Sequence, residues 1–193
     1  MELKPSGDSE SAHRICQILE DNQIHLKNKA GTWKSCLIFA VTKQRVERLA
    51  IEIRNYFKKR YGLKNCIAAV NHSGGDSNKF RNYSIDLTSN VETKINFQRW
   101  SDGKFPILVA TSSCGLGLDK KNLNLVIHYG LPLNLTDYQQ QTGRAGRGHQ
   151  LAKCGMLAFD PMSAYSRINT LNNALLSLTM LICALHHINS STI

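Results

Sequence analysis

Short apolar runs that alternate with helical patterns are the feature that most constrains the fold of this 193-residue chain. Apolar residues recur at helical spacing from Val46 until Gly62, and further helices are expected at residues 91–100 and from Thr136. The runs predict buried strands at residues 35–41, 66–70, 106–110, 125–129 and 154–159. This alternation predicts an α/β fold with a mostly parallel sheet and helices on both faces. Ligands of such sheets usually meet the loops at the carboxyl ends of the strands, here those after strands three and four.

The segment Gln140–Arg147 contains the strongest candidate motif, a Gly-Arg-x-Gly-Arg string. Its two arginines, Arg144 and Arg147, are three residues apart and are expected on the same side of a helical turn. A guanidinium suits a phosphate because its planar fork makes paired hydrogen bonds and never loses its charge. Taken alone, however, such a string is more often a flexible basic loop than a catalytic element.

A second candidate motif follows the third predicted strand. The strand ends in Thr111, and a glycine-rich turn with an acid, Gly115–Asp119, comes next. Backbone N–H groups and a hydroxyl in such a turn can bind phosphate. Taken alone, the pattern is explained as well by an ordinary strand-to-helix turn that needs glycine for its dihedral angles.

In this order and at this separation, the two motifs resemble those of superfamily 2 helicases. Residues 109–119 are similar to motif V, and residues 140–147 to motif VI, Q-x-x-G-R-x-x-R. Residues 37–42 with the basic helix after them are similar to motif IV, and residues 70–74 to the His-x-Gly element of these lobes. The resemblance covers roughly residues 33–165.

Within that superfamily the sequence looks most like the RecQ type, as seen at residues 128–132, Tyr138 and residues 159–161. RecQ-type proteins usually have Asp-Gly after the last motif VI arginine, where this chain has Gly148 and His149. The departure bears on the subfamily and not on the identity of the lobe.

The resemblance implies a three-layer RecA-like domain, the second lobe of a helicase that binds ATP between two lobes. Arginines of the second lobe stabilise the charge that develops on the γ-phosphate, a role that falls to Arg147 with support from Arg144. The residues expected to line the same cleft are Gln140, Gly143, Gly117 and Asp119. The residues expected to contact the nucleic-acid strand are Thr42, Lys43, His72, Gly74, Thr111 and Ser112. The implied partners are single-stranded or unwinding duplex DNA, tracked 3′ to 5′, and a first RecA-like lobe in cis or in trans.

The sequence contains no G-x-x-x-x-G-K-[ST] motif and no Asp-Glu-x-His or Asp-Glu-Ala-Asp box. Phosphoryl transfer needs a P-loop to hold the phosphates and a carboxylate to hold Mg²⁺. We therefore expect that the chain does not hydrolyse ATP alone, and that ATP with Mg²⁺ is held mainly by the first lobe.

Charge leaves two interpretations open. The net charge is +10, and residues 43–64 contain eight Lys or Arg and two Glu. Such a segment suits a polyanion such as nucleic acid, but a solvated helix face explains it equally well.

The six cysteines have no close C-x-x-C spacing, so no metal site is expected. They indicate reduced thiols in a protein that is nuclear in a eukaryote and otherwise cytoplasmic. The apolar run at residues 174–185 is shorter than the ~20 residues of a membrane span, so we expect a core or interface helix and no membrane partner. The expected segments are a helical or linker segment at 1–32, the lobe at 33–165, and an apolar helix and tail at 166–193.

Two rival functions remain. The first is a non-catalytic remnant of a helicase that binds nucleic acid or a partner protein, which the missing P-loop favours. The second is a Rossmann-type cofactor enzyme, suggested by Gly115 and Gly117. The second is weak because no G-x-G-x-x-G follows the first predicted strand.

Overall fold

The computed structural model describes residues 8–63, 68–71, 90–112, 120, 122–132, 134–147 and 151–157. In this part of the chain the elements are α1 (Asp8–Asp21), β1 (Ser35–Ala40), α2 (Lys43–Tyr61), β2 (Ala68–Asn71), α3 (Asn90–Ser101), β3 (Ile107–Thr111), β4 (Leu123–Tyr129), α4 (Leu135–Thr142) and β5 (Lys153–Leu157). Each predicted strand and helix in the described residues is confirmed to within a few residues at its ends.

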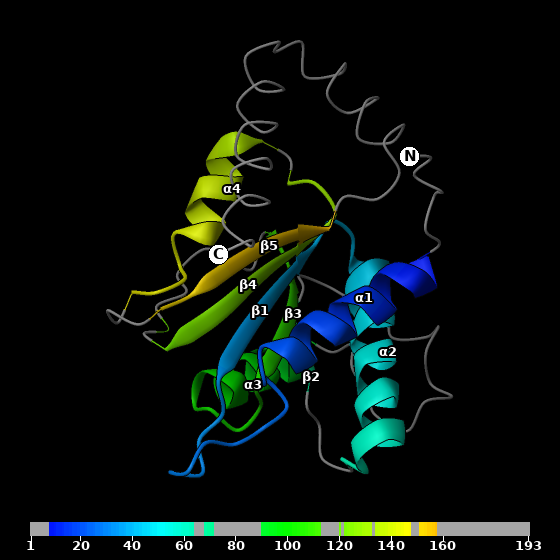
Figure 1. Ribbon diagram of the computed structural model, residues 1–193. Coiled ribbons are helices and arrows are strands. Elements are labelled where there is room, and N and C mark those ends of the chain that lie inside the picture. The colour runs from blue at the N-terminus through cyan, green and yellow to red at the C-terminus, as the bar shows by residue number, and fades with distance from the viewer. Residues whose placement is uncertain are drawn as a thin grey trace.

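The five described strands form one sheet in the order β2-β3-β1-β4-β5, and each neighbouring pair is parallel (Figure 1). All six residues of the central strand, β1, are buried. A continuous buried run, rather than an apolar–polar alternation, is what a strand covered on both faces requires. The predicted fold class is therefore confirmed.

Successive β1 side chains enter two separate cores, because neighbouring residues of a strand point to opposite faces. On one face Ile38 packs with α1 and α2, which lie together on that side of the sheet (Figure 1). On the other face Leu37 packs against Trp100 of α3 and against Ala145. Trp100 is fully buried there. The result is a helix–sheet–helix arrangement of three layers.

Helix α2 begins and ends at residues suited to those positions. The Oγ of Thr42 accepts a hydrogen bond from the backbone N–H of Arg45, at 3.3 Å, as an N-cap. Gly62 ends the helix with φ of +64°, and its N–H donates to the carbonyl of Lys58, at 3.0 Å. Thr42 is thereby fixed directly after the carboxyl end of β1.

Helix α1 packs into the same core as α2. Its Ile15 and Leu19 are fully buried. At its end Glu20 accepts a hydrogen bond from the Tyr61 hydroxyl and pairs with Nε of Arg60, each at 2.8 Å. Helix α1, in the segment before β1, therefore packs on the same face of the sheet as α2.

Several sequence predictions lie outside the described residues. The polar stretch at residues 73–90 predicts a loop, and Asp160 followed by Pro161 predicts a helix start. Residues 73–89, Asp160, Pro161 and the apolar run at residues 174–185 lie outside the described residues, whereas Asn90 begins α3 rather than ending a loop. Among the helices that the structure does describe, none is long and apolar enough to span a membrane.

Candidate functional site

Four of the predicted strand-contacting residues lie together at the carboxyl edge of the sheet. Thr42 and Lys43 follow β1, while Thr111 ends β3 and Ser112 follows it. β1 and β3 are neighbours, with Ala40 paired to Thr111. The start of α2 lies at the same edge, and a helix N-terminus carries partial positive charge. Hydroxyls, an exposed lysine and this helix end make the edge suitable for an anion.

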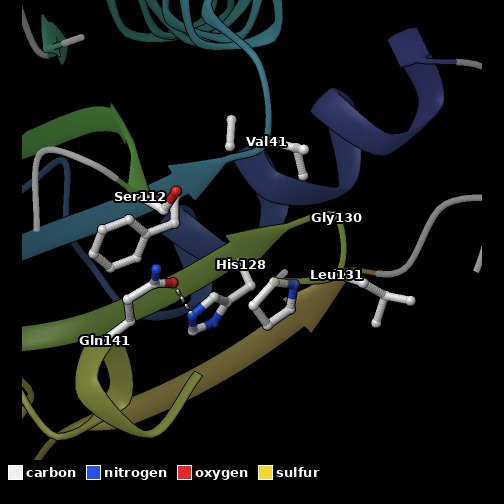
Figure 2. Close-up of a pocket in the computed structure, with 9 residues that line it drawn as sticks. Val41, Ser112, His128, Gly130, Leu131 and Gln141 are labelled. Carbon is white, nitrogen blue, oxygen red and sulfur yellow. Dashed lines mark hydrogen bonds between the residues drawn. The ribbon is translucent and has the colours of Figure 1, made fainter. Parts of the chain in front are cut away.

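A small pocket opens at this edge, between the ends of β1, β3 and β4. Its cavity volume is about 30 Å³. Figure 2 shows Ser112 and Gln141 on its wall, with His128 bound to Gln141. The described lining residues are Phe39, Ala40, Val41, Ser112, His128, Gly130, Leu131, Pro132 and Gln141.

His128, in β4, anchors α4 to the sheet. Its Nε2 lies 2.9 Å from Oε1 of Gln141 in a buried hydrogen bond. Its ring stacks on Phe39, with centroids 5.6 Å apart, and contacts Tyr138 at 5.1 Å. Burial lowers the pKa of His128 to about 4, against the weaker opposing effects of Gln141 and the Gly155 backbone. The ring is therefore neutral at pH 7.

Sequence reasoning did not single out His128 and Gln141 as a pair. His128 served only as a sign of resemblance, and Gln141 only as a variable position in motif VI. The available signal was a histidine inside an otherwise apolar strand, since a buried polar group needs a partner.

The arginines of motif VI lie away from that edge. Helix α4 ends at Thr142, and the chain then turns, with φ of +72° at Gly146. The N–H of Gly146 donates to the carbonyl of Leu123, the first residue of β4, at 3.2 Å. The chain thus leaves the carboxyl end of β4, runs back along the sheet as α4, and reaches the amino end of β4 in the second half of motif VI (Figure 1).

Two sequence expectations are corrected by this path. The pattern placed the informative residues in loops at the carboxyl ends of the strands, but the turn that carries Arg144 and Arg147 is bonded, through Gly146, to Leu123 at the amino end of β4. The pattern also placed the two arginines on one helical turn, but they belong to the turn that follows α4.

The charge of Arg147 acts on its neighbour Arg144. Arg144 is half-buried and Arg147 is exposed. Burial lowers the pKa of Arg144, and the positive charge of Arg147 lowers it further. Nε of Arg147 donates to the carbonyl of Gly143 at 3.3 Å, which holds its side chain against the end of α4. An anion bound here would offset the repulsion between two neighbouring cations.

Gly143 and Gln140 have different surroundings. A Cβ added at Gly143 would lie 2.9 Å from the carbonyl oxygen of Gln139, so a larger residue would force the backbone to move. Gln140 is exposed on α4. The remaining predicted site residues, His72, Gly74, Gly117 and Asp119, lie outside the described residues.

Lys120, the first described residue after motif V, is attached to the end of α3. Its Nζ donates to the carbonyls of Trp100 and Ser101, at 2.7 and 2.8 Å. The same ammonium lies 4.7 Å from the centroid of the Trp100 ring. Burial lowers the pKa of Lys120. The chain that follows motif V is therefore fixed to the second core.

The described cysteines are poor candidates for chemistry. Cys16, Cys36 and Cys154 are free thiols, and burial raises the pKa of Cys16 to about 12 and that of Cys36 well above its usual range. A thiol reacts and binds metals as the thiolate. Among the residues that the structure describes, no three His, Cys, Asp or Glu side chains gather as metal ligands.

Comparison with known proteins places the chain in a family. Residues 11–149 match the helicase conserved C-terminal domain. The ATP-dependent DNA helicase hus2/rqh1 of Schizosaccharomyces pombe is 30% identical over 155 residues, which are 80% of this chain and 9% of that protein. The ATP-dependent DNA helicase RecQ of Pasteurella multocida is 30% identical over 128 residues, 66% of this chain and 17% of that protein. The chain thus spans less than a fifth of either relative.

Solved structures share the fold. The helicase Lhr of Mycobacterium smegmatis, bound to ssDNA and AMP-PNP, aligns with a TM-score of 0.60 at 21% identity, over 79% of this chain and 17% of that one. The DUF1998 helicase MrfA bound to DNA aligns with a TM-score of 0.59 at 21% identity, over 83% of this chain and 20% of that one. The arrangement of the described strands and helices agrees with these matches. The chain belongs to the helicase conserved C-terminal domain family and is RecQ-like in sequence within the superfamily 2 helicases.

Proposed function

We propose that this chain acts as the second lobe of an ATP-dependent 3′–5′ DNA helicase of the RecQ type. The observation that carries the proposal is the arginine pair after α4, where burial and the neighbouring charge of the exposed Arg147 lower the pKa of the half-buried Arg144. A family whose members act on ATP gives that pair a natural anion, the triphosphate.

In this proposal the residues of motif VI bind the nucleotide from the side of the second lobe. Arg147 contacts the γ-phosphate as the catalytic arginine, and Arg144 supports it. Gln140 and Gly143 line the same cleft, together with Gly117 and Asp119. Such an arginine stabilises the negative charge of the transition state and is worth ~10³–10⁵ in rate.

Bound ATP with Mg²⁺ supplies the phosphoryl group and its counter-ion. The donors described here fit only part of that ligand, because they are cations and amides and include no cluster of carboxylates for Mg²⁺. A first lobe with a P-loop, in cis or in trans, is therefore the proposed partner.

The carboxyl edge of the sheet is the proposed path of the DNA strand. Thr42, Lys43, Thr111 and Ser112 lie at this edge and would contact its phosphates, as would His72 and Gly74. Because these groups are hydroxyls, a lysine and a helix N-terminus, they would hold the backbone without regard to base sequence.

The test joins this chain to a first lobe that carries a P-loop and measures DNA-stimulated ATP hydrolysis. We expect Arg147→Ala to lower kcat by about 10³-fold while binding of the ground-state nucleotide changes little, because the charge it stabilises develops only in the transition state. Arg99→Ala, at an exposed position of α3, is the matched control and should keep wild-type turnover.

Two results would count against the proposal. Unchanged turnover in Arg147→Ala would remove the catalytic role of this arginine. A chain that binds DNA but supports no hydrolysis with any first lobe would be a non-catalytic, nucleic-acid-binding relative of helicases.

A further inference from the structure

The pocket at the carboxyl edge presents hydrogen-bond donors and no charge. None of the nine described residues that line it is Asp, Glu, Lys or Arg. Gln141 is 95% buried, with 5% of its surface exposed, and its oxygen is occupied by His128 at 2.9 Å. Figure 2 shows the nitrogen of this amide directed to the side on which Ser112 lies.

Two donors in this pocket are unused. Within the described part of the chain, neither Nε2 of Gln141 nor the hydroxyl of Ser112 has a hydrogen-bond partner. Both donors face the opening of the pocket, where a ligand with acceptor atoms can replace the water that they would otherwise bind. With Oε1 of Gln141 at 2.9 Å from Nε2 of His128, the amide nitrogen is directed to the side of the pocket on which Ser112 lies (Figure 2).

The walls favour a flat, neutral ligand over a phosphate. Phe39, Val41, Leu131 and Pro132 contribute apolar surface. A phosphate placed among them would lose its hydration without meeting a cation. A nucleobase instead offers carbonyl oxygens to the donors and an apolar face to the walls.

The position of the pocket agrees with such a ligand. Val41 is the residue before Thr42, and Ser112 is the residue after Thr111, so the pocket adjoins the residues proposed to hold the strand. A strand whose phosphates lie at Thr42 and Thr111 has its bases within reach of this opening. The small space admits the edge of one base rather than a whole nucleotide.

We propose that this pocket binds the carbonyl edge of one unstacked pyrimidine base of the single strand, with Nε2 of Gln141 and the hydroxyl of Ser112 as donors. The inference rests on the proposed function, since it assumes that a strand lies along this edge. The pocket would give the chain a preference among bases, which contacts to the DNA backbone alone do not give.

The experiment compares two oligonucleotides with the same phosphates. One is oligodeoxythymidylate, and the other carries difluorotoluene, a thymine isostere that keeps the shape but lacks carbonyl oxygens. Fluorescence anisotropy with the 193-residue chain gives a Kd for each. We expect the wild-type chain to bind the thymidylate about tenfold more tightly, the effect of one or two hydrogen bonds.

Variants of the pocket assign the preference to Gln141. In Gln141→Leu the ratio of the two Kd values should fall toward one, because the donor is gone. Gln139→Leu removes an amide from the exposed side of the same helix and should keep the wild-type ratio. Leu131→Trp is designed to fill the pocket and to leave the His128–Gln141 bond in place, and it should also bring the ratio of the two Kd values toward one. The test therefore stands even if Gln141→Leu fails to fold.

The outcomes separate this inference from the proposed function. If the wild-type chain binds both oligonucleotides equally well, the pocket holds solvent only and the inference is overturned, while backbone binding stands. If the ratio survives in Gln141→Leu and Leu131→Trp, the preference arises elsewhere, which also overturns it. If neither oligonucleotide binds, the proposed path of the strand fails as well.

Discussion

His128 occupies an unusual position for a histidine, the interior of a sheet at the level of the strand tips. It is 1% exposed and lies between Phe39 and Tyr138, with one nitrogen bound to Gln141. The apolar spacing of the sequence predicted that β4 is buried. It could not predict the His128–Gln141 bond, because the two residues are 13 positions apart and only the return of α4 along the sheet brings them together.

The buried histidine makes the stability of the fold depend on pH. The pKa of His128 is about 4 in the folded chain and 6.5 in the reference state, so below pH 6.5 the unfolded chain takes up a proton that the folded chain refuses. The contribution of the neutral His128 ring to the free energy of unfolding is complete above pH 6.5. It is lost as the pH falls toward 4, and the total loss is about 3 kcal/mol.

Urea denaturation at a series of pH values from about 7.5 down to about 4 measures this loss, because the range begins above the ordinary histidine pKa and ends about 2 units below it. We expect His128→Gln to lose stability more gradually with falling pH than the wild-type chain. Exposed His13 is the control, and His13→Gln should keep the wild-type slope. Burial also lowers the pKa of His25, but His25 contributes equally to all three proteins. Parallel slopes in wild type and His128→Gln would contradict the prediction.

At the scale of elements, the ends of the helices decide where the candidate site residues lie. The end of α2 was readable in the sequence, because glycine is the residue that adopts the left-handed conformation at a helix C-terminus. The end of α4 was not. Apolar spacing does not reveal that α4 stops at Thr142, so the spacing of Arg144 and Arg147 suggested a shared helical turn that the chain does not make.

Gly62 gives a direct test of the helix end. Its φ is +64°, and a Cβ there would meet no atom within 4 Å, so the cost of Gly62→Ala comes from backbone strain alone. We expect a loss of about 1 kcal/mol in the free energy of unfolding. Gly155→Ala in β5 also meets no atom within 4 Å but requires no positive φ, so it should cost clearly less. Equal losses in both variants, measured by urea denaturation, would show that strain at Gly62 is not the cause.

At the scale of the whole molecule, the sheet and its two layers of helices followed from the sequence, whereas the role of α1 did not. The alternation of buried runs and helical patterns was enough for the strands, because a parallel sheet needs apolar residues on both faces. The N-terminal segment was expected as a separate helical or linker region. The structure packs it on α2, and the family match begins within it, at residue 11.

The contribution of α1 to folding can be measured at Leu19. This side chain is fully buried in the core that includes α2 and β1, so Leu19→Ala should lower the free energy of unfolding by about 2–5 kcal/mol. Arg14→Ala, at an exposed position of the same helix, should change it by less than about 0.5 kcal/mol. If Leu19→Ala were as harmless as Arg14→Ala, α1 would be a dispensable attachment to the domain.

The return path of α4 has a mechanical consequence. Gln141 is the last residue but one of α4, so the helix end that borders the pocket is also the end from which the arginine turn begins. Helix α4 is therefore a short rod whose buried Gln141 is clamped to the sheet beside the arginine turn. Tilting that rod about the clamp would shift the arginines whenever its opposite end is displaced.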